Sequence, residues 1–291
     1  MRSLESIAFV KPNLEVIIQS LWEQIASHTS KSAPTEIQAP AQRIFIHLDY
    51  ILSEKMQDRV DTLQEQIEQL WKDGGGIVQF EYERKSGKRI LVTVYPVCLH
   101  YARRAKYLSA YGQDPAGHFG WHNYRLDRIV SSRLTLMNWQ HPQVPPKLKE
   151  MYKAGTLPTP ETVSEALAQA WGFNFYLPRK LLIMRFPSSF AKRYVQDTER
   201  HPTFEPIAYS KLPMLVKQAV EDADEQAAVL KVLAQKNSRD KYYRAWVRLG
   251  DINVVMRLRD WRPKGEVIAP VELRRLMHEE AQQECLHYVE Y

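Results

Sequence analysis

The stretch from residue 77 to residue 133 most constrains the fold of this chain, because it alternates apolar and polar residues in short runs between turns. Such alternation is typical of β-strands that bury one face. The predicted strands are residues 77–82, 90–95, 97–101, 106–111 and 124–130, with Pro96 expected to end the second. Five short, twisted strands tend to curl into a small barrel, since closure removes unpaired edges.

The same region holds a concentrated positive charge. Between Arg84 and Arg133 there are ten Lys/Arg and two Asp, a local charge of +8, whereas the whole chain carries +6. The rest of the chain is therefore close to neutral. A charge confined to one module indicates an anionic partner for that module.

Other elements surround the predicted barrel. An apolar stripe predicts a helix over residues 13–26, and a polar, proline-containing segment after it indicates a linker. A strand is expected at 44–48 and an amphipathic helix at 57–72, which the glycines at 74–76 end. We expect four units: residues 1–40 as helix and linker, 41–137 as barrel with its leading helix, 138–159 as surface linker, and 160–291 as an α/β unit.

The C-terminal unit alternates helix and strand signals. Helices are predicted at residues 160–171, 188–199, 215–235, 252–261 and 270–288, and strands at 181–186, 242–249 and 267–268. In the last helix, Leu273, Leu276, Met277 and Ala281 are expected to be buried. The fold class is therefore α+β: a small barrel followed by an α/β extension.

The ordered motifs resemble the WYL domain. They are Tyr95-Pro96, a basic turn, Tyr107-Leu108 and the run Tyr124-Arg125-Leu126-Asp127-Arg128-Ile129, with Lys106 in place of the Trp in the family's name. The later runs 170–172, 184–186, 198–202 and 267–274 resemble the extension that follows this domain in the family. The resemblance covers roughly residues 42 to 285.

The resemblance implies an SH3/Sm-like barrel with an α/β extension, a homodimer, and a nucleic-acid or nucleotide ligand sensed through a basic, aromatic groove. Most members are bacterial transcription regulators with an N-terminal winged helix, and others accompany CRISPR and phage-defence systems. The first forty residues are too short for a full winged helix. We therefore expect that this DNA-binding domain lies elsewhere or that the protein acts without one.

Six residues are the predicted ligand site: Tyr101, Arg103, Arg104, Tyr107, Arg125 and Arg128. Arginine pairs two phosphate oxygens, and tyrosine stacks on bases. Alternation places Arg125 and Asp127 on the face opposite Arg128, so both arginines cannot point into one groove. We choose Arg125 as the ligand-binding residue. Asp127 and Arg128 are expected to form a structural ion pair instead. The alternative is a solvated basic face with half-buried tyrosines. A further hypothesis is that Arg257 and Arg259 of a partner protomer complete the ligand groove in a dimer.

Several functions are disfavoured by the sequence. Cys98 and Cys285 form no metal or redox pattern, no apolar run reaches the roughly 20 residues of a membrane span, and no signal peptide is visible. We therefore expect a cytoplasmic protein with no metal, no cofactor and no enzymatic activity, although a group of His100, Tyr101 and Arg103 stays open as a catalytic alternative.

Two functions remain in competition. The first is a ligand-sensing transcriptional regulator associated with CRISPR or phage defence. The second is an accessory protein of a CRISPR-type effector that binds single-stranded RNA or DNA without a transcriptional role. A regulator needs a second site that responds to binding, whereas an accessory needs only affinity. A plain protein-interaction module is a third possibility.

Overall fold

The computed structural model describes residues 53–102, 105–114 and 117–288. The expected helix at 13–26 and strand at 44–48 lie outside these residues. Along the chain the helices and strands are α3 (Glu54–Lys72), β1 (Ile77–Glu83), β2 (Arg89–Ala102), β3 (Ala105–Gln113), β4 (Phe119–Arg125), η2 (Leu126–Arg128), β5 (Thr135–Met137), α4 (Pro146–Ala154), α5 (Pro160–Gln169), β6 (Arg179–Phe186), α6 (Ser188–Tyr194), β7 (Glu205–Ile207), η3 (Tyr209–Lys211), α7 (Leu212–Ala219), α8 (Ala223–Ala234), β8 (Lys241–Arg248), α9 (Ile252–Arg259), β9 (Glu266–Ala269) and α10 (Val271–Leu286).

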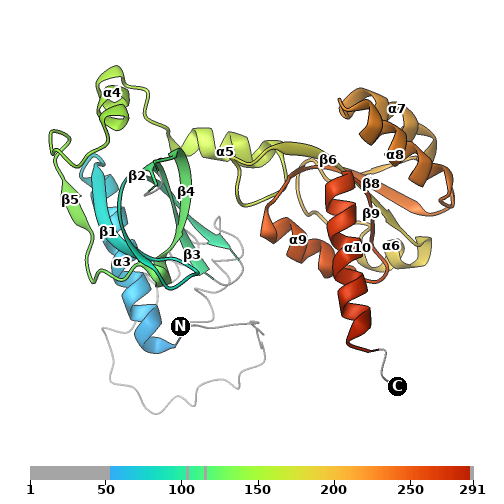
Figure 1. Ribbon diagram of the computed structural model, residues 1–291, viewed down its shortest axis with the longest axis horizontal. Helices are drawn as coiled ribbons and strands as arrows, with labels where there is room; N and C mark the ends of the chain where they lie inside the picture. The colour runs from blue at the N-terminus through green and yellow to red at the C-terminus, as the bar shows by residue number, and fades with distance from the viewer. Residues whose placement is uncertain (1–52, 103–104, 115–116, 289–291) are drawn as a thin grey trace, which may run out of the picture.

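The first five strands form an antiparallel sheet in the order β4-β3-β2-β1-β5, and the ribbon curls into a barrel-like shape (Figure 1). A bridge between Tyr82 and Ile129 joins β1 to the segment after β4, which draws the two sides of the sheet together. The apolar stripe of α3, with Val60, Leu63 and Ile67, packs against the inner face of this sheet. The predicted α+β class and its small barrel are confirmed.

The second sheet has the antiparallel order β7-β8-β6-β9. Both faces are buried, as the almost continuous apolar run of β6 requires. Leu182 and Met184 pack with Val254 of α9, while Leu181 and Ile183 pack with residues of α7 and α8. The extension therefore has three layers, with α7 and α8 on one face and α6, α9 and the start of α10 on the other (Figure 1).

Three local predictions were wrong. Pro96 does not end a strand, because β2 continues through it with a bulge between Pro96 and Cys98. The strand expected at 124–130 runs over Phe119–Arg125 and then turns into η2. Helix α6 ends at Tyr194, earlier than expected. The segment 138–159, expected as a surface linker, contains the short helix α4.

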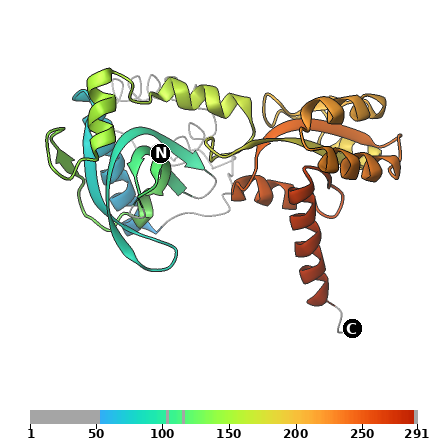
Figure 2. The same ribbon diagram turned by 45° about the horizontal axis from the view of Figure 1, so that its top comes forward.

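Helix α10 departs from its predicted burial. Leu273 is buried, but Leu276 and Ala281 are exposed, because α10 extends away from the sheet over its C-terminal half (Figure 2). The expected boundaries of the four units stay predictions. Among the described residues, no helix combines the length and apolar character needed to cross a membrane.

Candidate nucleic-acid interface

One face of the barrel points away from its core and toward the extension. Residues directly opposite each other in a sheet share a face. The register pairs His100 with Tyr107 and Tyr107 with Arg125, and it pairs Ser109 with Asn123. Their neighbours on the other face, such as Leu108 and Tyr124, belong to the barrel core. We call the first set, together with Cys98, Tyr111 and Trp121, the outer barrel face.

A chain of polar contacts crosses this face. The Cys98 Sγ lies 3.2 Å from the His100 Nε2, and the Ser109 hydroxyl donates a short hydrogen bond to the Asn123 amide oxygen. The Asn123 Nδ2 donates to the Oδ1 of Asn174, at 2.8 Å. Asn174 follows α5, so this bond joins the barrel to the extension.

Aromatic rings lie beside these polar groups. Phe173 packs on Tyr107 with ring centroids 4.7 Å apart and meets His100 edge-on at 5.3 Å. Phe175 meets Trp121 edge-on at 4.8 Å and is almost fully buried. The segment Phe173–Asn174–Phe175 therefore covers the aromatic part of the outer barrel face. We call it the covering segment.

A group of arginines gathers at one end of the barrel, next to this face. The Arg125 guanidinium forms two bonds to the Asp127 carboxylate, at 3.0 and 2.5 Å. Arg59 of α3 donates to the Asp127 carbonyl oxygen. Arg128 lies near the Tyr82 hydroxyl, where its charge opposes the rise that burial causes in the pKa of Tyr82.

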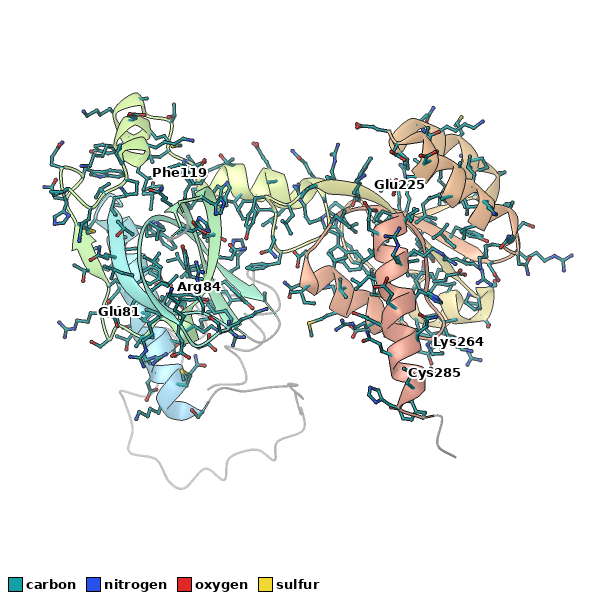
Figure 3. All side chains as sticks on the ribbon, viewed as in Figure 1. Glu81, Arg84, Phe119, Glu225, Lys264 and Cys285 are labelled. Atoms are coloured by element: carbon teal, nitrogen blue, oxygen red, sulfur yellow. The ribbon has the colours of Figure 1, made fainter. Side chains whose placement is uncertain are left out.

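Arg84 joins the same end from the turn after β1. Burial raises the pKa of Tyr124, and the positive charge of Arg84 partly offsets that rise. The Tyr124 ring lies 5.1 Å from that of Tyr82. Figure 3 shows Arg84 on the barrel, in the same half of the molecule as Glu81. We call Arg59, Arg84, Arg125 and Arg128, with Asp127 and Tyr82, the basic end of the barrel.

The structure divides the residues predicted from sequence. Tyr107 and Arg125 lie together on the outer barrel face, with Arg128 at the adjoining basic end. Tyr101 lies on the opposite side of the sheet, where its hydroxyl donates to Gln64 of α3 and its ring meets Lys106. Tyr101 therefore does not share a groove with Tyr107.

Arg103, Arg104 and the expected Asp127–Arg128 ion pair are the remaining predicted features of the site. Arg103 and Arg104 lie outside the described residues. The expected Asp127–Arg128 ion pair was wrong, because Asp127 pairs with Arg125 instead. The strand ends at Arg125, and the turn of η2 brings the Asp127 carboxylate back beside the Arg125 side chain.

Sequence reasoning missed Arg59, Tyr82 and the covering segment as parts of this site. Arg59 and Tyr82 each lie beside apolar residues of α3 and β1, so their pattern indicates only the edge of a core. Phe173 and Phe175 follow a helix without any motif. Their roles depend on contacts between segments more than 50 residues apart in the sequence, as the Asn123–Asn174 bond illustrates.

The arginines proposed as a partner contribution have contacts within this chain. Arg259 pairs with Glu280 of α10, which lowers the pKa of that carboxyl group. Arg257 lies over the Trp171 ring, 5.7 Å from its centroid. Both side chains are exposed on α9, and their contribution to a partner protomer stays a prediction.

The catalytic alternative is not supported by the geometry. His100 and Tyr101 are neighbours on a strand and point to opposite faces, so they cannot act on one reacting group. Burial lowers the pKa of His100 to about 4 and raises the pKa of Cys98 to about 11. Within the described part of the chain, no three His, Cys, Asp or Glu side chains gather as metal ligands would.

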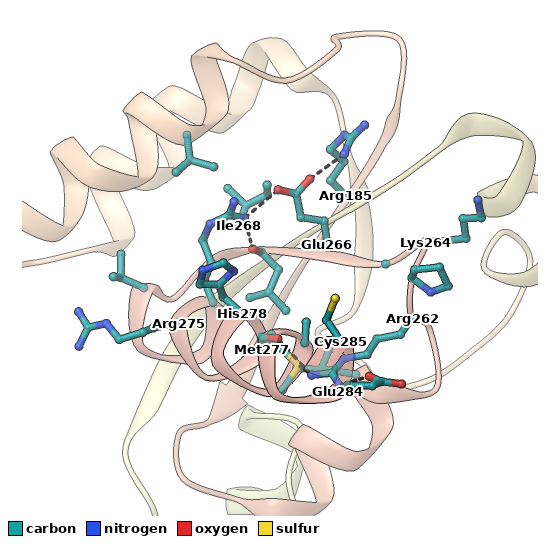
Figure 4. Close-up of a pocket in the computed structure, with 18 of the residues that line it drawn as sticks. Arg185, Arg262, Lys264, Glu266, Ile268, Arg275, Met277, His278, Glu284 and Cys285 are labelled. Carbon is teal, nitrogen blue, oxygen red and sulfur yellow. Dashed lines mark hydrogen bonds and ion pairs between the residues drawn. The ribbon is translucent and has the colours of Figure 1, made fainter. Parts of the chain in front are cut away.

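A separate groove of about 1180 Å³ lies in the extension between α8, β9 and α10 (Figure 4). Arg185 and Arg274 on its wall both bind Glu266, at 2.7 and 2.8 Å. Arg262 binds Glu280 and Glu284. These arginines are engaged in ion pairs that join β6, β9 and α10, so they stabilise the extension, and the groove lies away from the outer barrel face.

Comparison with known proteins places a family match on the barrel. Residues 74–134 match the family model of the WYL domain. Among solved structures, the chain is similar to proteasome accessory factor B/C of Arthrobacter aurescens, with 14% identity and a TM-score of 0.27, over 78% of this chain and 27% of that one.

A second similar structure is described as a CRISPR Cas-related protein. It shows 11% identity and a TM-score of 0.41, over 81% of this chain and 54% of that one. The chain thus spans about a quarter and about half the length of these two proteins. No curated protein matches the sequence.

Proposed function

We propose that this chain, in which residues 74–134 match the WYL-domain family model, is a regulatory protein that binds a nucleic-acid or nucleotide ligand on its barrel. The observation that carries the proposal is the basic end. Arg125 pairs with the Asp127 carboxylate and Arg59 donates to the Asp127 carbonyl oxygen, while the charges of Arg128 and Arg84 oppose the rise in the pKa of Tyr82 and Tyr124. The four arginines and one aspartate of this group leave a surplus of three positive charges.

The chemistry of this group suits phosphate. A guanidinium can pair two oxygens of a phosphate in a planar fork, and the Asp127 carboxylate orients the fork of Arg125. Arg125 lies directly opposite Tyr107, and a base that replaced Phe173 on the Tyr107 ring would stack next to this charge. Phosphate binding beside a stacking ring gives affinity for a nucleotide with little dependence on sequence.

The contact between barrel and extension favours a regulator over a simple binding accessory. The covering segment touches the outer barrel face, and the Asn174 backbone N–H donates to Asp251, which also begins α9. A ligand at the barrel thus has a structural route to a second part of the molecule, as a regulator requires. The wider proposal is a cytoplasmic, non-enzymatic homodimer that acts in CRISPR or phage defence.

The test is fluorescence anisotropy with short labelled single-stranded RNA, single-stranded DNA and duplex DNA across a salt series. Wild type is compared with Arg125→Ala/Arg128→Ala. We expect binding to weaken about tenfold or more, because charged hydrogen bonds contribute roughly 1.5–3 kcal/mol each. For single strands, the slope of log affinity against log salt should become shallower by about 1.4, or about 0.7 for each lost phosphate contact.

The matched control is Lys192→Ala/Arg193→Ala on α6, which removes two exposed positive charges far from the barrel. If both double variants lose affinity equally, the binding reflects net charge and the basic end is not the site. Wild-type binding that is weak for all three probes would refute a nucleic-acid ligand.

A further inference from the structure

The covering segment hides the part of the barrel best suited to hold a base. Tyr107 and His100 present ring faces or edges to Phe173, and Asn123 presents an amide to Asn174. We infer that this part of the outer barrel face is a site for one nucleobase, which the chain fills in this structure with its own Phe173 and Asn174. This inference rests on the proposed function and names its ligand class.

The ring contact supports the inference first. Phe173 packs on Tyr107 at a centroid distance of 4.7 Å, which lies in the range of stacked and tilted aromatic pairs. Bases stack on such rings in proteins that bind single strands. Phe173 is only partly buried, unlike Phe175, so its ring can leave the platform without opening a core.

The amide contact supports it independently. The Asn123 Nδ2 donates to the Asn174 Oδ1, and its own Oδ1 accepts from Ser109, which fixes the amide with its N–H groups outward. Asparagine amides bind acceptors on base edges in the same way. The covering segment thus supplies a flat ring and an edge acceptor side by side, which are the two features of a nucleobase that this surface can recognise.

The position of the charge fits a nucleotide in this place. Arg125 stands opposite Tyr107 in the β3–β4 register, and Asn123 lies two residues before Arg125 on the same face. A base on Tyr107 would therefore have the basic end beside it for its phosphate. Stacking, edge recognition and phosphate binding lie along two neighbouring strands.

The segment is held in place from the side of the extension. The Asn174 N–H donates to the Asp251 Oδ2 at 2.6 Å, and Asp251 is completely buried. Arg248 donates to the carbonyl oxygens of Leu177 and Ala166 on either side of the segment. Since the Asp251 Oδ1 also accepts from Asn253 at the start of α9, one carboxylate holds both the backbone of the covering segment and that helix, and a shift of the Asn174 backbone would be transmitted to α9.

The test is the affinity of Phe173→Ala for two labelled single-stranded DNA probes of equal length, one of oligothymidine and one abasic. Removing Phe173 leaves the platform open, so a base no longer competes with a side chain. We expect the thymidine probe to bind Phe173→Ala at least about fivefold more tightly than it binds wild type. This factor corresponds to the lower end of the free energy of one base–aromatic stack. Abasic affinity should not change.

Two further variants test whether the gain in affinity depends on the flat ring of Phe173 and on the amide of Asn123. Phe173→Leu preserves an apolar contact without a flat ring, and it should show a smaller gain in the same direction. Adding Asn123→Ala to Phe173→Ala should remove part of the base-dependent gain. Tyr194→Ala, an exposed aromatic residue of the extension, should leave both probes unaffected.

The outcomes separate the two proposals. If wild type binds both probes through Arg125 and Arg128, but neither Phe173 variant shows a base-dependent gain, Phe173 is interdomain packing and this inference is wrong while the proposed function stands. An equal gain for both probes would also overturn it. If neither probe binds wild type or the Phe173 variants, the proposed function itself fails.

Discussion

His100 is kept neutral by its surroundings. Its ring meets Phe173 and Phe175, and its Nε2 lies 3.2 Å from the Cys98 Sγ. Burial lowers the pKa of His100 to about 4 and raises that of the Cys98 thiol to about 11. A thiolate–imidazolium pair, which would make a nucleophile, is therefore disfavoured at neutral pH. The pair is suited to packing, which supports the proposal of a non-enzymatic protein.

A pH dependence of stability follows from this pKa. Between about pH 4 and 6.5 the unfolded chain binds a proton at His100 that the folded chain does not, so the free energy of unfolding falls as the pH is lowered through this range. For this group the loss is at most about 3 kcal/mol. We expect His100→Gln to lose less stability than wild type between neutral pH and pH 4, measured by urea unfolding.

Exposed His118 supplies the control, since His118→Gln removes a histidine outside the barrel core. It measures the effect of removing an exposed histidine that lies beside Asp114, so the effect specific to His100 is the difference between the two variants. Burial also lowers the pKa of His122 and His201, but both histidines remain in wild type and in His100→Gln, so they cancel in that comparison. Equal pH dependence in wild type and His100→Gln would show that His100 is protonated freely in the folded state.

At the scale of single residues, the sequence predicted part of the site. Alternation within residues 124–128 placed Arg125 and Asp127 on one face, Tyr107 and Arg125 were both chosen for the ligand site, and the charge count indicated an anion site in this region. Tyr101 was grouped with Tyr107, but β2 and β3 pair His100 with Tyr107 and Tyr101 with Lys106, so Tyr101 lies on the other face. This register depends on how the two strands pair, which local alternation does not give, and the turn that pairs Asp127 with Arg125 was hidden for the same reason.

Among the elements, β3 approaches β2 closely at one point. A Cβ atom at Gly112 would lie 2.9 Å from the Val94 Cγ1 and 3.1 Å from the Thr93 carbonyl oxygen. Gly120 is the partner of Gly112 on β4, and a Cβ atom there would meet no neighbour within 4 Å. Of these two paired glycines, Gly112 has no room for a side chain and Gly120 has room for one.

The two glycines make a matched test of this packing. We expect Gly112→Ala to lower the free energy of unfolding by about 1–3 kcal/mol, because the added methyl group must displace Val94 or the β2 backbone. Gly120→Ala should be neutral or slightly stabilising, since alanine reduces the freedom of the unfolded chain. Urea midpoints measure both. Similar losses in the two variants would indicate a general demand for glycine in these strands.

Element types were predicted better than their ends. The helices α3 and α5 and the strands β1, β6 and β8 follow from apolar periodicity, which depends on local sequence. The exposed face of α10 could not be foreseen, because its apolar spacing looks the same whether or not a layer covers it. Leu276 and Leu286 are exposed for this reason.

On the scale of the whole molecule, one buried ring lies at the junction of barrel and extension. Phe175 lies in a cluster with Val97 of the barrel and Val163 of α5, and it meets Trp121 of β4. These residues come from separate stretches of sequence that show no shared motif, so the junction could not be predicted from the chain. We expect the contacts at this junction to determine whether the two sheets unfold together.

The last prediction concerns this junction. Phe175→Ala should cost about 3–5 kcal/mol, the usual range for a buried phenylalanine, and the loss should fall on the contact between the sheets. We expect calorimetry to show one transition for wild type and two separate transitions for Phe175→Ala, because each sheet keeps its own core. Tyr194→Ala, at an exposed position of the extension, should keep a single transition. If Phe175→Ala kept one transition at a lower temperature, the Asn123–Asn174 bond and the remaining ring contacts would suffice to couple the sheets, and a ligand that displaces Phe173 alone would not uncouple them.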